Sequence, residues 1–227
     1  MIFCYWHGTE RNLIREGIYA WRDHFPDFRI IGDSDIESMI ARDFPDYLEA
    51  YQKIRIPACK SDIARLVALY EWGGLYVDCH CGIRVAKMIG RLLGHLDTFE
   101  LIVIDDDFER RPDDPARLNP MNGILFARKN SEIIFEWEKA AFRNLARHWA
   151  VEKERGFRPY CIWDLTGAGV LHRIILDTEK RALKARFAQN VQIIPKDLSP
   201  VAVHVYRSYR KAGMHWHERE VKELLFD

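Results

Sequence analysis

Hydrophobic residues in this chain fall into two alternating kinds of segment. Short unbroken apolar runs, rich in β-branched and aromatic residues, are typical of buried strands. Between them, apolar positions recur every three or four residues, as in amphipathic helices. This alternation predicts an α/β fold with a mostly parallel central sheet flanked by helices. We expect strands at 2–6, 28–32, 75–79, 100–106, 122–129, 191–195 and 201–206, and helices at 10–25, 33–44, 61–72, 131–154, 166–187 and 216–226.

Local signals indicate where some of these elements begin and end. Pro26 follows the first helix, and the Gly73–Gly74 pair ends the third. Ser34 and Glu37 have the spacing of a capping box at the start of the second helix.

The charge balance argues against one class of partner. Lys plus Arg and Asp plus Glu number 34 each among 227 residues, so no excess positive charge favours nucleic acid. No apolar run reaches the length of a membrane span, and residues 1–12 lack the features of a secretory signal. The five cysteines are odd in number and dispersed, which argues against a disulfide framework. We expect one cytoplasmic domain over residues 1–227.

The stretch GGLYVDCHCGI at residues 73–83 carries the first candidate chemistry. If the strand continues through it, alternation places Asp78 and His80 on the same face, at an edge where α/β sheets bind ligands. A carboxylate and an imidazole suit a divalent metal such as Mn²⁺. One alternative is an Asp–His hydrogen bond that caps the strand. Another is a zinc site using Cys79 and Cys81, which their spacing disfavours.

The preceding helix adds a buried pair of charges. Asp62 and Arg65 are three residues apart and share one helix face. The alternative is an exposed ion pair of little energetic value. Because most of this helix is apolar, we expect the acid and the arginine to need a partner or a ligand.

These residues together resemble a known family. The run PACKSDIARLVALYEWGGLYVDCHCGI at residues 57–83 closely resembles the signature of DXD-containing sugar transferases with a GT-A fold. That family includes initiating α-mannosyltransferases of the Golgi and bacterial capsule and lipopolysaccharide transferases. Weaker matches extend over most of the chain, at residues 2–8, 21–35, 121–134, 165–171 and 202–209.

The resemblance implies a role for each matching residue. Trp6 would stack on the base of a nucleotide donor, and Asp62 with Arg65 would hold its sugar and diphosphate. Asn122 would line the sugar or acceptor side. The remaining implied roles are a turn near the transferred sugar at Thr166 and Gly167, and contacts to the β-phosphate from Ser208 and Tyr209.

The chain departs from the family motif at the metal. His80 replaces the second acid of D-x-D. Polypeptide N-acetylgalactosaminyltransferases, another GT-A family, use D-x-H with a distant histidine on manganese. By that resemblance Asp78, His80 and His204 would bind Mn²⁺ or Mg²⁺. The alternative is an inactive relative that binds a nucleotide or sugar. Tyr209 and Ala168 also depart from the family pattern, replacing a tryptophan and a proline.

The implied activity is a metal-dependent glycosyl transfer, with retention of configuration. A UDP- or GDP-sugar would donate to a glycan or lipid-linked acceptor in bacterial surface polysaccharide synthesis. A lipid-linked acceptor would require peripheral contact with the membrane. Residues 105–120 would be a surface loop, in which Asp105–Asp107 are either solvated or border the acceptor site. The basic cluster of Arg207, Arg210 and Lys211 would either meet phosphate or anionic lipid, or be a solvated strand end.

Overall fold

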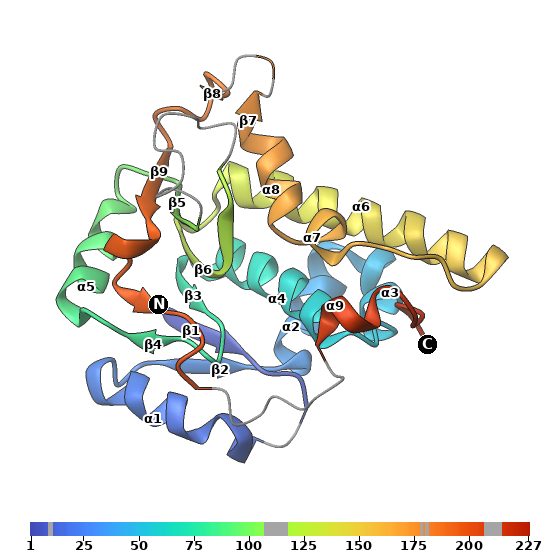
Figure 1. Ribbon diagram of the computed structural model, residues 1–227, viewed down its shortest axis with the longest axis horizontal. Helices are drawn as coiled ribbons and strands as arrows, with labels where there is room; N and C mark the ends of the chain where they lie inside the picture. Colours follow the sequence, from blue (N-terminus) through green and yellow to red (C-terminus); the bar gives the residue numbers. More distant parts are fainter. Residues whose placement is uncertain (9–10, 107–117, 178, 180–181, 207–214) are drawn as a thin grey trace.

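A six-stranded mixed sheet forms the centre of the fold, with strand order β2-β1-β3-β6-β5-β9. The computed structural model describes residues 1–8, 11–106, 118–177, 179, 182–206 and 215–227 (Figure 1). Strand β6 is antiparallel to both of its neighbours, and the other strands all run in one direction. The predicted α/β fold with a mostly parallel sheet is therefore confirmed. The strands of this sheet are β1 (Ile2–Tyr5), β2 (Arg29–Ile31), β3 (Gly74–Val77), β5 (Leu101–Asp105), β6 (Pro120–Ala127) and β9 (Val191–Pro195).

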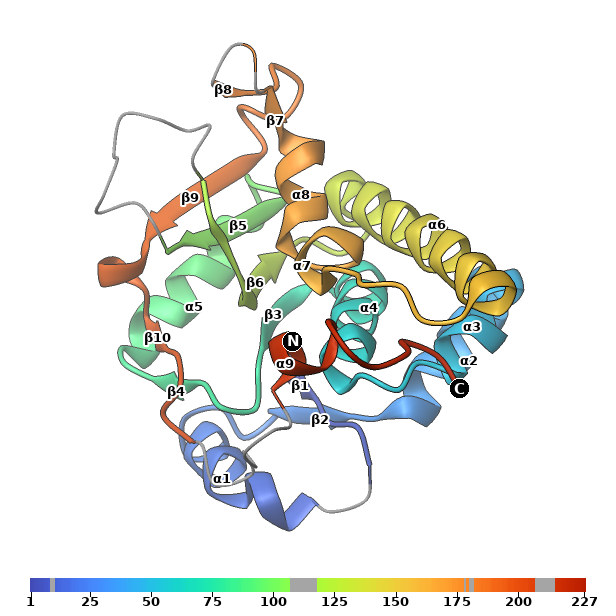
Figure 2. The same cartoon turned by 45° about the vertical axis from the view of Figure 1, so that its right-hand side comes forward.

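Helices cover both faces of the sheet (Figures 1 and 2). One face packs against α1 (Arg15–His24) and α5 (Ala86–His95). The other packs against α2 (Asp33–Asp43), α3 (Leu48–Gln52), α4 (Pro57–Trp72), α6 (Glu132–Arg155) and α8 (Ala168–Ile175). The short elements are η1 (Arg11–Ile14), η2 (Pro45–Tyr47), β4 (Gly82–Ile83), α7 (Ile162–Leu165), β7 (Leu176–Asp177), β8 (Ala182–Leu183), η5 (Lys196–Leu198), β10 (Val201–Ala202) and α9 (Trp216–Arg219).

Strand alternation divides the core between the two faces. In β1, Phe3 and Tyr5 belong to the cluster under α4, while Ile2 and Cys4 belong to the cluster under α1 and α5. Every residue of β1 is buried, as expected for a strand covered on both sides. The unbroken apolar runs of the sequence therefore correspond to central strands.

Helix α4 is buried over most of its surface and leads directly into β3. It begins at Pro57, earlier than the predicted 61, because proline suits the first turn, where no N–H is needed. It ends at Trp72 and is capped by Gly73, whose φ is 66°, followed by Gly74 with a φ of 104°. A Cβ on Gly74 would lie 2.0 Å from the Met1 carbonyl oxygen, so only glycine lets β3 begin beside the N-terminus.

Three predicted elements end at least four residues before the expected position. The helix predicted up to residue 187 ends at Ile175, because the chain then turns into the β7–β8 pair and Lys184 N–H donates to the Ile175 carbonyl. The strand predicted at 201–206 ends at Ala202, and His204 has a φ of 61°, which turns the chain. The terminal helix covers only Trp216–Arg219. Tertiary pairing overrides local propensity at these sites.

The capping box of α2 also differs from the prediction. Gly32 is the N-cap, and its N–H donates to Oδ2 of Asp35 at 2.9 Å. Ser34 and Glu37 do not form the box, because the N-cap lies two residues before Ser34. No helix in the described part of the chain combines the length and apolar character of a membrane span.

Candidate nucleotide-sugar site

A cavity of about 480 Å³ lies where β1 and β3 end. Its walls come from the end of β1, the first half of α4, the turn after β3, the start of β6, and α7 with α9. The predicted site residues that line it are Trp6, Asp62, Arg65, Asp78, His80, Asn122 and Gly167. Segments more than a hundred residues apart thus meet at this edge of the sheet.

Asp62 is a buried carboxylate with three donors around it. It is 4% exposed. Asn122 Nδ2 donates to its Oδ1 at 2.6 Å, and Thr166 Oγ1 donates to its Oδ2 at 2.8 Å. Arg65 Nη2 lies 3.2 Å from Oδ1. Burial raises the pKa of Asp62 to about 6, although the charge of Arg65 and the hydrogen bond from Thr166 oppose the shift.

Arg65 links Asp62 to the end of β3. Its Nη2 lies 3.5 Å from Oδ1 of Asp78, and its guanidinium carbon is 4.7 Å from the centre of the Tyr76 ring. It also donates to the Ser61 and Asn122 carbonyl oxygens. Burial disfavours the charge, but the surrounding acidic groups outweigh burial and raise the pKa of Arg65. Arg65 therefore remains a cation between two carboxylates.

Asp78 is the more exposed of the two acids, with a quarter of its side chain accessible. Tyr76 Oη donates to its Oδ1 at 2.8 Å. Burial would raise the pKa of Asp78, but the charge of Arg65 and the neighbouring His80 outweigh it, so this pKa is lowered. A Cβ on Gly123 would lie 2.6 Å from Oδ2, so this glycine leaves room for the carboxylate. The arrangement keeps Asp78 ionised beside the cavity.

His80 reaches Asp78 by a different route from the one predicted. The predicted strand alternation is wrong here, because β3 ends at Val77 and the chain then turns, with Cys81 N–H donating to the Asp78 carbonyl at 2.9 Å. The turn still brings His80 Nε2 to 4.0 Å from Asp78 Oδ2. The His204 ring stacks on that of His80, with centroids 4.7 Å apart.

Asp78 and His80 fit one divalent cation as a pair of ligands. Bonds of about 2.1 Å from each side span about 4.2 Å, slightly more than the separation of the two donor atoms. The described residues hold no group of three His, Cys, Asp or Glu side chains that could hold a metal ion. The trio with His204 is therefore not assembled here and stays a prediction.

The thiols beside His80 are occupied by packing. Cys81 is fully buried in the core under α1 and α5. Cys79 Sγ donates to the Tyr5 carbonyl oxygen at 3.1 Å. A hydrogen bond with Cys4 and burial raise the pKa of Cys79, so this thiol is a poor metal ligand.

Two further predicted residues meet at Asp62. Asn122 lines the cavity, and its Oδ1 is buried without a hydrogen-bond partner among the described residues. An acceptor of this kind suits a sugar hydroxyl. Thr166 is buried behind Asp62 and positions it from outside the cavity. Ser208 and Tyr209, and most of the charged loop at 105–120, lie outside the described residues.

Sequence reasoning missed several residues of the site. Tyr76 holds Asp78 and stacks under Arg65, and its place two residues before Asp78 on the strand could have indicated this. His7 lines the cavity, and its Nδ1 lies 2.6 Å from Asp33 Oδ2. Trp163 closes the cavity from α7, and no local pattern signals its approach.

The family comparison identifies this region. Residues 12–87 match the model of the family described as the glycosyltransferase sugar-binding region containing DXD motif. The match covers α1 through β4 and includes Asp62, Arg65, Asp78 and His80. The resemblance found in the sequence is therefore confirmed: this third of the chain is similar to the sugar-binding region of that glycosyltransferase family.

Solved structures similar to this chain include domains of toxins. The PaToxG glycosyltransferase aligns at 20% identity with a TM-score of 0.45, over 77% of this chain and 67% of that one. The UDP-bound glycosyltransferase domain of the YGT toxin aligns at 12% identity with a TM-score of 0.46, over 89% and 59%. The ligand-free form of that domain aligns at 12% identity with a TM-score of 0.43, over 88% of this chain and 60% of that one. This chain thus spans about 60% of the YGT domain's length. No curated protein matches this chain.

Proposed function

We propose that this chain is a glycosyltransferase that transfers a sugar from a UDP- or GDP-sugar to a glycan or lipid-linked acceptor, assisted by Mn²⁺ or Mg²⁺. The observation that carries the proposal is the Asp62–Arg65–Asp78 network, which is buried beside the cavity and lies within the family's sugar-binding region. Such a network of charges is costly to bury and suits a charged ligand.

The charges of the site match a nucleoside diphosphate leaving group. Its departure develops negative charge, which a fixed cation such as Arg65 stabilises. Asp78 and His80 would hold a divalent cation, and phosphate oxygens would complete the coordination. When bound, that cation supplies further neutralisation of the leaving diphosphate.

The other residues orient the donor. Trp6 offers an aromatic face for the nucleotide base, and the buried Oδ1 of Asn122 offers an acceptor for a sugar hydroxyl. Asp62 is already held by Asn122, Thr166 and Arg65, so it is a poor nucleophile. This argues against a covalent enzyme intermediate on Asp62, and retention by attack on the same face of the sugar stays a prediction. A role in bacterial surface polysaccharide synthesis and a cytoplasmic location stay predictions.

A second candidate is a non-catalytic protein that binds a nucleotide or sugar. The observation that favours it is His80, which replaces the second acid of the motif and stacks on His204. In that case the network would bind the donor, but no metal would be needed for binding and no sugar would be released.

Thermal unfolding with UDP and GDP, each with and without Mn²⁺, tests these two functions. The variants are His80→Ala and, as a matched control, His95→Ala on the far side of the sheet, in α5. The transferase predicts that one nucleotide raises the melting temperature in a manganese-dependent way, that His80→Ala abolishes this shift and that His95→Ala preserves it. Release of free sugar from the matching nucleotide sugar then separates the enzyme from the binding protein. Binding that ignores both metal and mutation would support the binding protein.

A further inference from the structure

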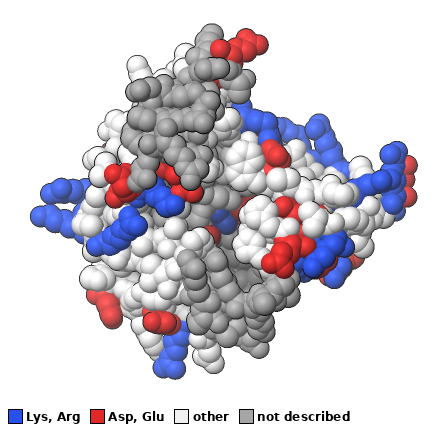
Figure 3. Space-filling view, in the orientation of Figure 1, with Lys and Arg blue, Asp and Glu red and all other residues white. Residues whose placement is uncertain are grey.

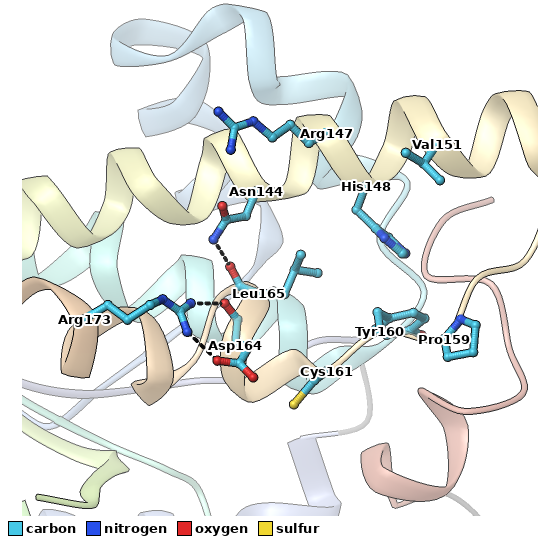
Figure 4. A pocket seen from close by; sticks show the side chains of 10 residues that line it. All are labelled: Asn144, Arg147, His148, Val151, Pro159, Tyr160, Cys161, Asp164, Leu165 and Arg173. Carbon is cyan, nitrogen blue, oxygen red and sulfur yellow. Dashed lines mark hydrogen bonds and ion pairs between the residues drawn. The ribbon is translucent and has the colours of Figure 1, made fainter. Parts of the chain in front are cut away.

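A second groove lies on the other side of α7 from the donor cavity. Its volume is about 440 Å³, and its walls are α6, the segment at 159–161, α7 and α8 (Figure 4). Asn144 and His148 point from α6 across the groove, toward Leu165 and Tyr160 (Figure 4).

Helix α7 forms a wall that the two cavities share. Asp164 and Leu165 line the groove, while Ile162 and Trp163 line the donor cavity. Arg173 of α8 pairs with Asp164, and Asn144 Nδ2 donates to the Leu165 carbonyl at 2.9 Å, so the wall is fixed from the groove side. A molecule bound in the groove would therefore lie next to the site of transfer without blocking the donor.

The rim of the groove continues into a basic stripe along α6. Lys139, Arg143, Arg147, Val151 and Arg155 follow each other at four-residue spacing, so they form one row on the helix surface that turns around the axis by about 40° at each step. At 1.5 Å per residue the stripe is about 24 Å long. Arg147 and Val151 belong to both the stripe and the groove, so the two surfaces are continuous.

The positive charge on this stretch is local. The whole chain has 34 basic and 34 acidic residues, yet the described residues between 139 and 158 expose six basic side chains and one acid, Glu154. The other acid there, Glu152, is buried and accepts from the Leu225 and Phe226 N–H groups. Figure 3 shows Lys and Arg side chains gathered over the right-hand part of the molecule, where α6 lies.

Five of these six cations have no counter-charge within the described part of the chain, and two of the five, Lys139 and Lys153, lie over the rings of Phe135 and Trp149. Arg143, Arg147 and Arg158 are exposed, and no carboxylate among the described residues forms an ion pair with them. In the groove, Tyr160 Oη is buried without a hydrogen-bond partner among those residues, and the His148 ring meets the Tyr160 ring edge-on at 5.0 Å. The Tyr160 hydroxyl can donate a hydrogen bond to a ligand hydroxyl, and the nearby arginines can bind its negative charges.

We propose that the groove and the basic stripe bind an anionic glycan, the acceptor chain of the transferase. The inference rests on the proposed function and adds the chemical class of its acceptor. A flexible linear polymer with repeated carboxylates or phosphates can follow a row of cations that winds along about 24 Å of helix, whereas a flat lipid surface can neither follow it nor enter the groove. The stripe binds the glycan at a distance from the donor, and the end of the glycan reaches past α7 to the donor sugar.

Titration with oligogalacturonate tests the proposal, with a neutral dextran oligosaccharide of equal length as the comparison. Arg143→Glu/Arg147→Glu reverses two charges of the stripe. The matched control is Lys87→Glu/Arg91→Glu, an exposed basic pair with the same spacing on α5, which packs on the other face of the sheet. We expect the protein to bind oligogalacturonate and not dextran. The affinity for oligogalacturonate should fall about tenfold in the stripe variant. It should also fall in 0.5 M salt, where the screening length between exposed charges is about 4–5 Å.

The stabilisation by UDP or GDP with Mn²⁺ is measured on the same variants. It should be unchanged in both, so a failure of acceptor binding is distinguished from a failure of the donor site. Equal binding of dextran, no binding of oligogalacturonate, or equal weakening in the α5 control would each overturn the proposal. Stronger binding to vesicles of phosphatidylglycerol and phosphatidylcholine than to oligogalacturonate would overturn it in favour of a membrane surface.

Discussion

Replacing Thr166 by valine tests whether Asp62 is held as an ionised, buried carboxylate. Thr166 is fully buried, and its Oγ1 donates to Asp62 Oδ2 at 2.8 Å. Valine has nearly the same shape but cannot donate, so the change removes the bond to Asp62 and the long contact of 3.7 Å with Cys59 Sγ, but little packing. The Thr166 carbonyl, which accepts from Trp137 Nε1, is retained.

The expected loss depends on the charge of Asp62. A hydrogen bond to an ionised group contributes about 1.5–3 kcal/mol, and one to a neutral group about 0.5–1.5 kcal/mol. Burial raises the pKa of Asp62 to about 6. We therefore expect Thr166→Val to lower the free energy of unfolding by about 2 kcal/mol at pH 8 and by about 1 kcal/mol at pH 5. The larger loss corresponds to about 4–8 °C in melting temperature for a chain of this size.

The sign of the pH dependence follows from the direction of the shift. The pKa of Asp62 is higher in the folded protein than in the unfolded chain, so the folded state holds this proton more tightly. Its contribution to stability is greatest below pH 4 and declines as the pH rises toward 6. Thr166→Val lacks a donor that favours the ionised form of Asp62, so the pKa of Asp62 rises further in the variant. The stability that the protonated Asp62 contributes is therefore lost at higher pH in the variant than in the wild type.

Urea denaturation at pH 5 and pH 8 measures the free energy of unfolding of each variant and its dependence on pH. Thr166→Ser is the control, because it keeps the hydroxyl and loses one methyl group, at a cost of about 1 kcal/mol that should not depend on pH. A loss in Thr166→Val that is equal at the two pH values, or smaller than the loss in Thr166→Ser, would refute the reasoning.

Three further substitutions test the site and the core. Gly123→Ala would place a Cβ 2.6 Å from Asp78 Oδ2. We expect manganese-dependent nucleotide binding, measured by calorimetry, to weaken about 10–100-fold. An unchanged affinity would contradict a role for Asp78 in binding the metal. Arg65→Lys keeps a charge but loses the fork of donors that contacts Asp78 and the Asn122 carbonyl, so stabilisation by UDP or GDP should fall although circular dichroism is preserved. Phe142→Ala, at a side chain 1% exposed, should lower the free energy of unfolding by about 3–5 kcal/mol in urea and leave nucleotide affinity within twofold; a loss under 1 kcal/mol would show that this core can collapse.

The site was predictable where its residues are close in sequence. Asp62 and Arg65 share one helix turn, and Asp78 follows the next strand, so a single local run carries their chemistry. The same run carries the family match at residues 12–87. The roles implied for Ser208 and Tyr209 stay predictions, because these residues lie outside the described part of the chain.

The remaining partners of Asp62 depended on contacts that no local pattern encodes. Asn122 is 60 residues away and Thr166 is 104 residues away, yet both donate to its carboxylate. Their approach requires β6 to pair with β3 in the antiparallel sense, and α7 to close over α4.

The sequence by itself determined β1, β3 and β5, because every residue of these strands is buried and each reads as an apolar run. It also determined the buried charge pair of α4. Only the tertiary structure decided that β6 runs against its neighbours, that 78–81 is a turn, and that α8 stops at Ile175. The physical reason is that apolar periodicity reports local burial, whereas strand direction, turn closure and helix ends depend on hydrogen bonds to distant segments.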